Sequence, residues 1–168
     1  MALVAMLTFA GTSPAVAADE IAGKVAEVRS GDTIVVDTGE GATVVRLSDI
    51  DAPQGSEYFA PGSRALLNAM VGGKDVRVVV AGVAKDGPTF GRVHAGELDV
   101  NVEMVKRGAA YVCWEFAVET DYRPWEQRAK DAGVGLWGQN WEIQAIGACM
   151  RRPPVANPDP SRVKAAQQ

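Results

Sequence analysis

Four charged residues are the first candidates for chemistry: Asp32, Arg46, Asp51 and Arg92. Carboxylates are the ligands that hard cations such as Ca²⁺ prefer, and guanidinium groups bind phosphate through paired hydrogen bonds. A metal ion and cationic side chains around one phosphate are what phosphodiester cleavage requires. The residue types therefore predict a phosphodiester site, provided that the fold brings the four side chains together.

Taken singly, each of the four also has an ordinary structural explanation. Asp32 follows Ser30-Gly31 in a turn-like stretch, and Asp51 precedes Pro53 in a stretch typical of a loop. An arginine on a strand commonly lies on a solvated face. The chemical interpretation therefore depends on the elements that position all four.

The elements that must position these residues begin with a β-meander. Stretches rich in β-branched residues, separated by turns such as Gly39-Glu40-Gly41, predict strands. This arrangement puts Asp32 and Arg46 on neighbouring strands and Asp51 in the loop that leaves the third strand. The expected strands span residues 23–28, 33–37, 42–47, 74–80 and 90–95.

Three helices are expected beside these strands. Pro61 and Ser63 open the first helix, which runs to Val71 with Ser63 as its N-cap. The other two span residues 101–107 and 124–132, each followed by a glycine. Five short strands with a helix after the third predict an α+β, mainly β fold: a five-stranded oligonucleotide-binding (OB) Greek-key barrel with about three helices packed against it.

Seven short segments then point to a family. They are Gly31-Asp32-Thr33-Ile34, Val45-Arg46-Leu47, Ile50-Asp51-Ala52-Pro53, Phe90-Gly91-Arg92, Val100-Asn101, Lys106-Arg107-Gly108-Ala109-Ala110 and Gly135-Leu136-Trp137. In this order the chain resembles the staphylococcal nuclease (thermonuclease) family over residues 21–137. The resemblance implies an OB barrel and calcium-dependent cleavage of DNA or RNA.

The same resemblance implies a role for each site residue. Asp32 and Asp51 match the family's calcium carboxylates, and Ala52 stands where a backbone carbonyl completes the coordination. Arg46 and Arg92 match the pair that binds the scissile phosphate. A guanidinium suits that role because it stays charged and offers two parallel hydrogen bonds to phosphate oxygens.

Two positions depart from the family pattern. Gln54 stands where many members carry a glutamate that activates or positions the attacking water. An amide orients water but accepts no proton near neutral pH, so the expected role of Gln54 is orientation alone. Ser30 replaces a further aspartate of the better-known members, which predicts weaker calcium binding. Glu57 is either a substitute for the missing acid or a solvated loop residue.

Trp114 and Phe90 are the aromatic residues expected to face the substrate. Stacking of a base on an aromatic ring contributes about 1–3 kcal/mol. Trp114 falls near a tyrosine that lies close to the phosphate in relatives, whereas core packing is the stronger explanation for Phe90. Glu126 is either a solvated helix residue or a partner of an arginine, and His94 is expected to be structural.

The two ends of the chain differ in composition from its middle. Residues 1–17 are expected to form a signal peptide, because an apolar stretch precedes Ala15-Val16-Ala17, although a basic head is absent. A membrane anchor needs about 20 apolar residues, so a periplasmic or secreted protein without stable membrane insertion is expected. Residues 21–140 form the expected nuclease domain, 141–150 a C-terminal extension and 151–168 a disordered Pro-rich tail.

The cysteine count and the net charge limit which disulfide and which nucleic-acid partner we expect. Cys113 and Cys149 form one disulfide in an oxidising compartment or remain two free buried thiols. The formal net charge of −4 argues against broad coating of nucleic acid and leaves room for a local basic cleft. DNA or RNA is the expected partner as substrate, and a monomer is expected.

Three hypotheses follow for function. The first is an exported, calcium-dependent phosphodiesterase of endonuclease type, with Gln54 orienting the water. The second is a binding module that keeps the cleft and has lost efficient chemistry through Gln54 and Ser30. The third is an envelope interaction protein that keeps only the barrel.

Overall fold

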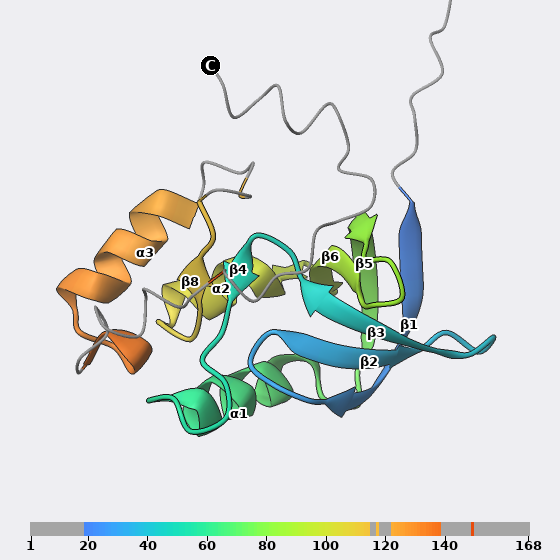
Figure 1. Cartoon of the computed structure of the whole chain (residues 1–168), viewed down its shortest axis with the longest axis horizontal. Helices are drawn as coiled ribbons and strands as arrows, with labels where there is room; N and C mark the ends of the chain where they lie inside the picture. The colour runs from blue at the N-terminus through green and yellow to red at the C-terminus, as the bar shows by residue number, and fades with distance from the viewer. Residues whose placement is uncertain (1–18, 115–116, 118–121, 139–148, 150–168) are drawn as a thin grey trace, which may run out of the picture.

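Five strands form a closed barrel in the computed structural model, which describes residues 19–114, 117, 122–138 and 149 (Figure 1). Neighbouring strands run antiparallel in the order β3-β2-β1-β5-β6, and a parallel pairing of β3 with β6 closes the barrel. The α+β OB-barrel prediction is confirmed. The barrel strands are β1 (Glu20–Val28), β2 (Thr33–Asp37), β3 (Ala42–Leu47), β5 (Asp75–Val83) and β6 (Thr89–Ala95).

Three strands of two residues each were not expected from the sequence. β4 (Ile50–Asp51) pairs with β8 (Tyr111–Val112) as a separate ribbon, and β7 (Leu98–Asp99) extends the sheet beyond β6. Two residues are too few to show an alternating pattern. Asp51 therefore lies on a paired strand, where a loop was expected.

Three α-helices accompany the barrel within the described part of the chain: α1 (Ala60–Val71), α2 (Val100–Lys106) and α3 (Tyr122–Asp131). A 3₁₀ turn, η1 (Gly135–Gly138), follows α3. In Figure 1, α1 lies across the bottom of the barrel, and α3 lies at the left beyond β8. No helix among the described residues is long and apolar enough to cross a membrane.

The expected N-cap of α1 is wrong. Phe59, with φ of 66°, precedes the helix and makes no side-chain cap hydrogen bond. The Ser63 hydroxyl instead donates to the carbonyl oxygen of Ala109 at 2.6 Å, inside the protein. This bond ties α1 to the segment that leads into β8.

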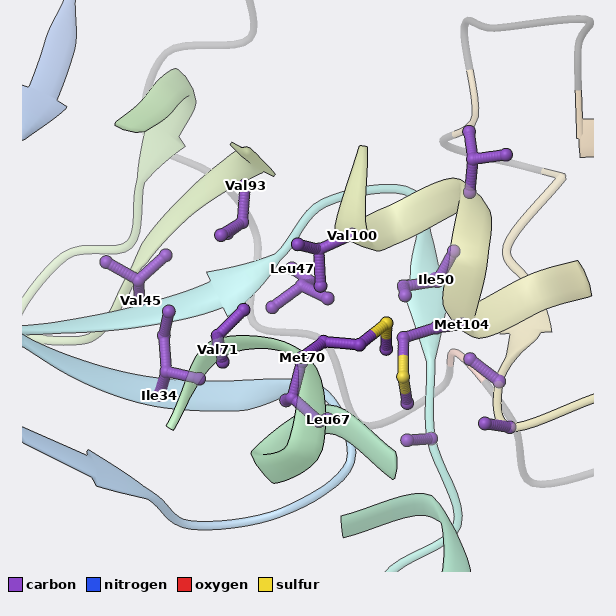
Figure 2. Packing of buried hydrophobic residues seen from close by; sticks show 14 of the residues in the cluster. Ile34, Val45, Leu47, Ile50, Leu67, Met70, Val71, Val93, Val100 and Met104 are labelled. Carbon is purple, nitrogen blue, oxygen red and sulfur yellow. The ribbon is translucent and has the colours of Figure 1, made fainter. Parts of the chain in front are cut away.

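One buried cluster fills the barrel and the space beneath the helices (Figure 2). Ile34, Val45 and Val93 come from three different barrel strands and are fully buried. Figure 2 shows Met70 of α1 beside Met104 of α2, where the two helices meet. Burial of each such side chain contributes about 1.5–3 kcal/mol, so the cluster fixes the strands that position the charged residues.

The expected end segments fall outside the part of the chain that the structure describes. These are the signal peptide at residues 1–17, the tail at 151–168 and the extension at 141–150 apart from Cys149. Cys149 itself forms a disulfide with Cys113, with the two Cα atoms 5.6 Å apart. Of the two alternatives for the cysteines, the disulfide is therefore the one observed.

Candidate active site

One guanidinium joins two aspartates from different parts of the chain. Nε of Arg46, on β3, donates to Oδ2 of Asp32 at 2.9 Å. Nη2 of the same side chain donates to Oδ1 of Asp51 at 2.5 Å. Three of the four residues singled out in the sequence therefore meet in one hydrogen-bonded cluster, which we call the Arg46 cluster: Asp32, Arg46 and Asp51.

The Arg46 cluster is buried and carries more negative than positive charge. Both aspartates are fully buried, and the Arg46 side chain is 9% exposed. An isolated buried carboxylate is very costly unless it is paired or coordinates a metal. Within these three side chains, two carboxylates face one guanidinium. Carboxylate oxygens are the ligands that a hard cation would use at this place.

The turn between β1 and β2 fixes the orientation of Asp32. The hydroxyls of Ser30 and Thr33 donate to Asp32 Oδ1 at 2.7 and 2.8 Å. The main-chain carbonyl of Asp32 accepts from the amide of Leu47, which follows Arg46 on β3. Ser30 therefore supports Asp32 as a hydrogen-bond donor, at the position where better-known members of the resembled family carry a further carboxylate.

Gly31 brings this turn against the rest of the site. A Cβ atom added to Gly31 would lie 1.8 Å from Oγ of Ser63 and 2.8 Å from Cβ of Ala52. Only glycine allows so close an approach. The turn that carries Asp32 is thus packed directly against Ala52, the buried residue that follows Asp51.

Asp51 is held by β4 and by a residue far along the chain. β4 pairs with β8, with Asp51 opposite Tyr111. The backbone amide of Cys149 donates to Asp51 Oδ2 at 2.7 Å. Both oxygens of the Asp51 carboxylate therefore accept a hydrogen bond, one from Arg46 and one from Cys149.

Arg92 lies on the strand next to Arg46. β3 and β6 pair in parallel with Arg46 opposite Phe90, and Arg92 is two residues further on β6, on the same side of the sheet. Nε of Arg92 donates to Asp99 Oδ2 at 2.5 Å, and its guanidinium lies 5.6 Å from the ring centre of Tyr122. The fourth predicted residue is thus on the adjacent strand, held by an acidic partner.

Gln54 and Glu57 form one turn after Asp51. The backbone amide of Gln54 donates to Glu57 Oε2 at 2.7 Å, and the amide of Glu57 donates to the Gln54 carbonyl at 3.0 Å. The Glu57 carboxylate therefore lies at the main chain of Gln54.

The two aromatic candidates differ sharply in exposure. Phe90 is 2% exposed, so its ring is buried, as the core-packing explanation expected, and the substrate-facing alternative for this residue is wrong. Trp114 is 38% exposed, with the Arg123 guanidinium 4.4 Å from its ring centre. Of the two, Trp114 is the one with a partly exposed side chain, and its contact with a substrate stays a prediction.

Glu126 organises the region around Trp114. It is 6% exposed, so the solvated-helix interpretation is wrong. Its Oε1 accepts from the Val112 amide at 3.0 Å, and its Oε2 accepts from Trp114 Nε1 at 3.2 Å and Lys130 Nζ at 3.1 Å. Glu126 therefore fixes both the end of β8 and the edge of the Trp114 ring.

Two groups in the site were missed by reasoning from the sequence. Asp99 pairs with Arg92 and also caps α2, because its Oδ1 accepts from the Val102 amide at 3.0 Å. An aspartate just before a helical pattern is a recognisable N-cap signal. The Cys149 amide is different, since a main-chain donor leaves no trace in residue type.

The site offers few side chains to a metal ion. Among the described residues, no three or more His, Cys, Asp or Glu side chains gather in a way that could hold one. Asp32 and Asp51 are therefore the carboxylate ligands on offer in this cluster. Ca²⁺ takes six to eight oxygen ligands, so the rest must come from main-chain carbonyls, water or a bound substrate.

Comparisons with known proteins show which family this chain resembles. A family model described as staphylococcal nuclease homologue matches residues 44–139, more than half of the chain. An uncharacterized endonuclease of Haemophilus influenzae is 32% identical over 122 residues, which cover 72% of this chain and 68% of that protein. The micrococcal nuclease of Shigella flexneri is 31% identical over 126 residues, covering 68% and 72%. Protein ParB of Escherichia coli is 34% identical over 155 residues, covering 85% and 86%.

Proposed function

This chain belongs to the staphylococcal nuclease family, and we propose that it is a calcium-dependent phosphodiesterase of endonuclease type that hydrolyses DNA or RNA. The observation that carries the proposal is the Arg46 cluster, where one guanidinium bridges two fully buried carboxylates. Two carboxylates on one arginine, next to the Ala52 main chain, suit a site that binds a cation and an anion together.

The donor chemistry of the cluster fits calcium. Asp32 and Asp51 would hold the ion, with the main-chain carbonyl of Ala52 as a third oxygen. A bound calcium ion supplies Lewis-acid stabilisation of the charge on the phosphate. Ser30 and Thr33 keep the Asp32 carboxylate oriented through their hydroxyls, which lowers the cost of arranging this ligand.

Arg46 and Arg92 would bind the scissile phosphate. In the structure their guanidinium groups are held by carboxylates, Arg46 by two aspartates and Arg92 by Asp99. A cation on the aspartates would satisfy their charge and leave Arg46 donors for phosphate oxygens. Such preoriented donors stabilise the charge that develops in the transition state.

Water is the proposed nucleophile, and Gln54 is proposed to orient it. The side-chain amide of Gln54 binds no proton near neutral pH, so general-base assistance, typically worth about 10²- to 10⁴-fold, is lost at this position. Glu57 is the proposed replacement, because its carboxylate accepts a hydrogen bond from the backbone amide of Gln54. We propose a low rate of hydrolysis in consequence.

Gln54 also supports a second candidate function. If the loss of the acid removes useful chemistry, the cluster would still bind a cation and a phosphate group. The protein would then be an oligonucleotide-binding module. This alternative and the nuclease share the same cleft and differ only in turnover.

We further propose that the protein acts in the periplasm or outside the cell, as a monomer. The Cys113–Cys149 disulfide supports this location, because such bonds form and persist in oxidising compartments.

Incubation of the purified protein with plasmid DNA and with RNA tests the proposal. The assay is run with calcium and with a chelator, beside Arg46→Ala, Arg92→Ala and Gln54→Glu. Cleavage by the parent only with calcium, and its loss in both arginine variants, supports the nuclease. Cleavage by Gln54→Glu alone supports the binding module. Cleavage that survives in Arg46→Ala contradicts both.

A further inference from the structure

A main-chain amide from the far end of the described chain lies on a proposed metal ligand. The Cys149 amide donates to Oδ2 of Asp51 at 2.7 Å, although the two residues are 98 positions apart. A hydrogen bond to an ionised carboxylate is about twice as strong as one between neutral groups. The contact therefore contributes to the orientation of Asp51.

The disulfide places Cys149 at this position. Its partner Cys113 follows β8, and the Cys113 amide donates to the Asp49 carbonyl at 2.7 Å. β8 itself pairs with β4, the strand that ends with Asp51. The two half-cystines are thus bonded to the two ends of β4: Cys113 to Asp49, just before the strand, and Cys149 to Asp51, its last residue.

Cys149 adopts a backbone conformation that needs support from its surroundings. Its φ is 69°, in the left-handed region that residues other than glycine seldom occupy. Such conformations persist where neighbouring contacts determine them. The disulfide to Cys113 and the bond to Asp51 are two such contacts, and both constrain where the Cys149 amide points.

The amide and a cation can share the Asp51 carboxylate. An ionised carboxylate has about four lone-pair sites on its two oxygens. Arg46 donates to Oδ1 and the Cys149 amide donates to Oδ2, and a carboxylate oxygen that accepts such a bond can still ligate a metal ion. Hydrogen bonds of this kind orient metal ligands, and their loss typically weakens metal binding 10- to 100-fold.

We propose that the Cys113–Cys149 disulfide is a positioning element of the calcium site. It holds the Cys149 amide on Asp51, so the calcium affinity of the protein depends on the oxidation state of this cysteine pair. The inference rests on the proposed calcium site. A dithiol reductant, itself oxidised to a disulfide, supplies the two electrons and two protons that convert the Cys113–Cys149 bond to two thiols. Cys149 is then released from Cys113, and its amide is no longer fixed on Oδ2 of Asp51.

The consequence is a nuclease whose metal site has its full calcium affinity only when the disulfide is formed. In a reducing compartment, where disulfides are rare, the same chain would carry a weaker calcium site. Calcium affinity, and with it the proposed activity, would therefore be higher in an oxidising compartment than in a reducing one. The residues of the Arg46 cluster would be the same in both.

The test compares calcium affinities measured by titration calorimetry. Oxidised wild type is compared with Cys113→Ser/Cys149→Ser, both well below their melting temperatures. The dissociation constant for calcium is expected to rise about 10- to 100-fold in the variant. Val78→Ala, in the buried core of β5, serves as a control that lowers stability away from Asp51. It should leave the calcium affinity unchanged.

Each outcome has a distinct meaning. Equal affinities for wild type and the double serine variant overturn this inference and leave the proposed calcium site intact. Absence of calcium binding by oxidised wild type overturns both. A loss of affinity in Val78→Ala that matches the loss in the serine variant makes the effect one of stability and overturns the positioning role.

A second measurement needs no variant and holds if the serine variant does not fold. Hydrogen exchange of the Cys149 amide is followed by NMR in oxidised wild type with and without calcium. Exchange that stays slow or slows further in calcium supports the proposal, because the amide then remains on Asp51 in the loaded site. Exchange that accelerates in calcium contradicts it, because the amide would then compete with the ion.

Discussion

Arg46 and Asp51 are five positions apart in the sequence and form a buried ion pair of 2.5 Å. The chain between them turns at Asp49, whose φ is 65°. Because of this turn, β4 lies outside the barrel while the carboxylate of Asp51 still contacts Arg46 on β3. The pair therefore joins the barrel to the β4–β8 ribbon. Arg46 is thus a structural ion-pair partner as well as the proposed phosphate-binding residue.

Loss of Arg46 should destabilise the fold as well as abolish cleavage. Arg46→Ala leaves two buried carboxylates without their arginine, and breaking a buried pair in this way costs about 3–5 kcal/mol. Chemical denaturation measures the change in free energy of unfolding. Arg107→Ala is the matched control, because that side chain is 52% exposed and pairs with Glu103 at the surface, where such pairs contribute about 1 kcal/mol or less. Equal losses in the two variants would contradict the role of Arg46.

Restoring an acid at position 54 should raise the rate of hydrolysis. Gln54→Glu supplies a group able to accept a proton, so kcat is expected to rise by up to about 10²- to 10⁴-fold. Steady-state cleavage of a short oligonucleotide measures it. Glu57→Gln in the parent tests the neighbouring acid: a fall in kcat would assign proton transfer to Glu57, whereas no change would leave water orientation to Gln54. An unchanged rate in Gln54→Glu would contradict the proposed place of the water.

A methyl group at Gly31 should disturb the turn that carries Asp32. In Gly31→Ala the new Cβ would overlap Oγ of Ser63, and overpacking of this kind typically costs about 1–3 kcal/mol. Gly41→Ala is the control, because nothing lies within 4 Å of its added Cβ. Thermal unfolding and calcium titration should both change in the first variant only. A Gly31→Ala protein with unaltered stability would show that the close packing around Ala52 is not needed.

His94 should make the fold less stable in mild acid. Burial lowers the pKa of His94 below its ordinary 6.5, Arg77 and Arg92 lower it further, and Asp99 and Glu20 oppose the shift. Between the lowered pKa and 6.5 the unfolded chain binds more protons, so stability is lost as the pH falls through this range. The free energy of unfolding, measured from about pH 7.5 to 5, should fall less in His94→Gln than in wild type. An equal fall in the free energy of unfolding in wild type and His94→Gln would contradict a lowered pKa of His94 as the cause.

The barrel was largely predictable because its strands carry their own signals. The strands at 33–37 and 42–47 have the same bounds in the structure as in the prediction. Their β-branched residues are bounded by turns, and alternation decides which side chains point inward. Strands of two residues, such as β4, carry no such signal, and only tertiary packing reveals them.

The site was predictable in its residue types and less so in its partners. Asp32, Arg46 and Asp51 meet as expected, whereas Phe90 is buried in the core. Ser63 was expected to cap a helix and instead bonds to Ala109 across the fold. Side-chain and main-chain partners far apart in sequence depend on packing, which local patterns do not encode.

The most direct test of the account is the calcium dependence of cleavage in aspartate variants. Asp32→Asn and Asp51→Asn each remove one proposed metal carboxylate, and Asp37→Asn removes an exposed carboxylate at the far end of β2. Wild type and Asp37→Asn are expected to cleave DNA or RNA with calcium and to stop in chelator, while the two cluster variants do not cleave at the same calcium concentration. Undiminished calcium-dependent cleavage by Asp32→Asn and Asp51→Asn would contradict it.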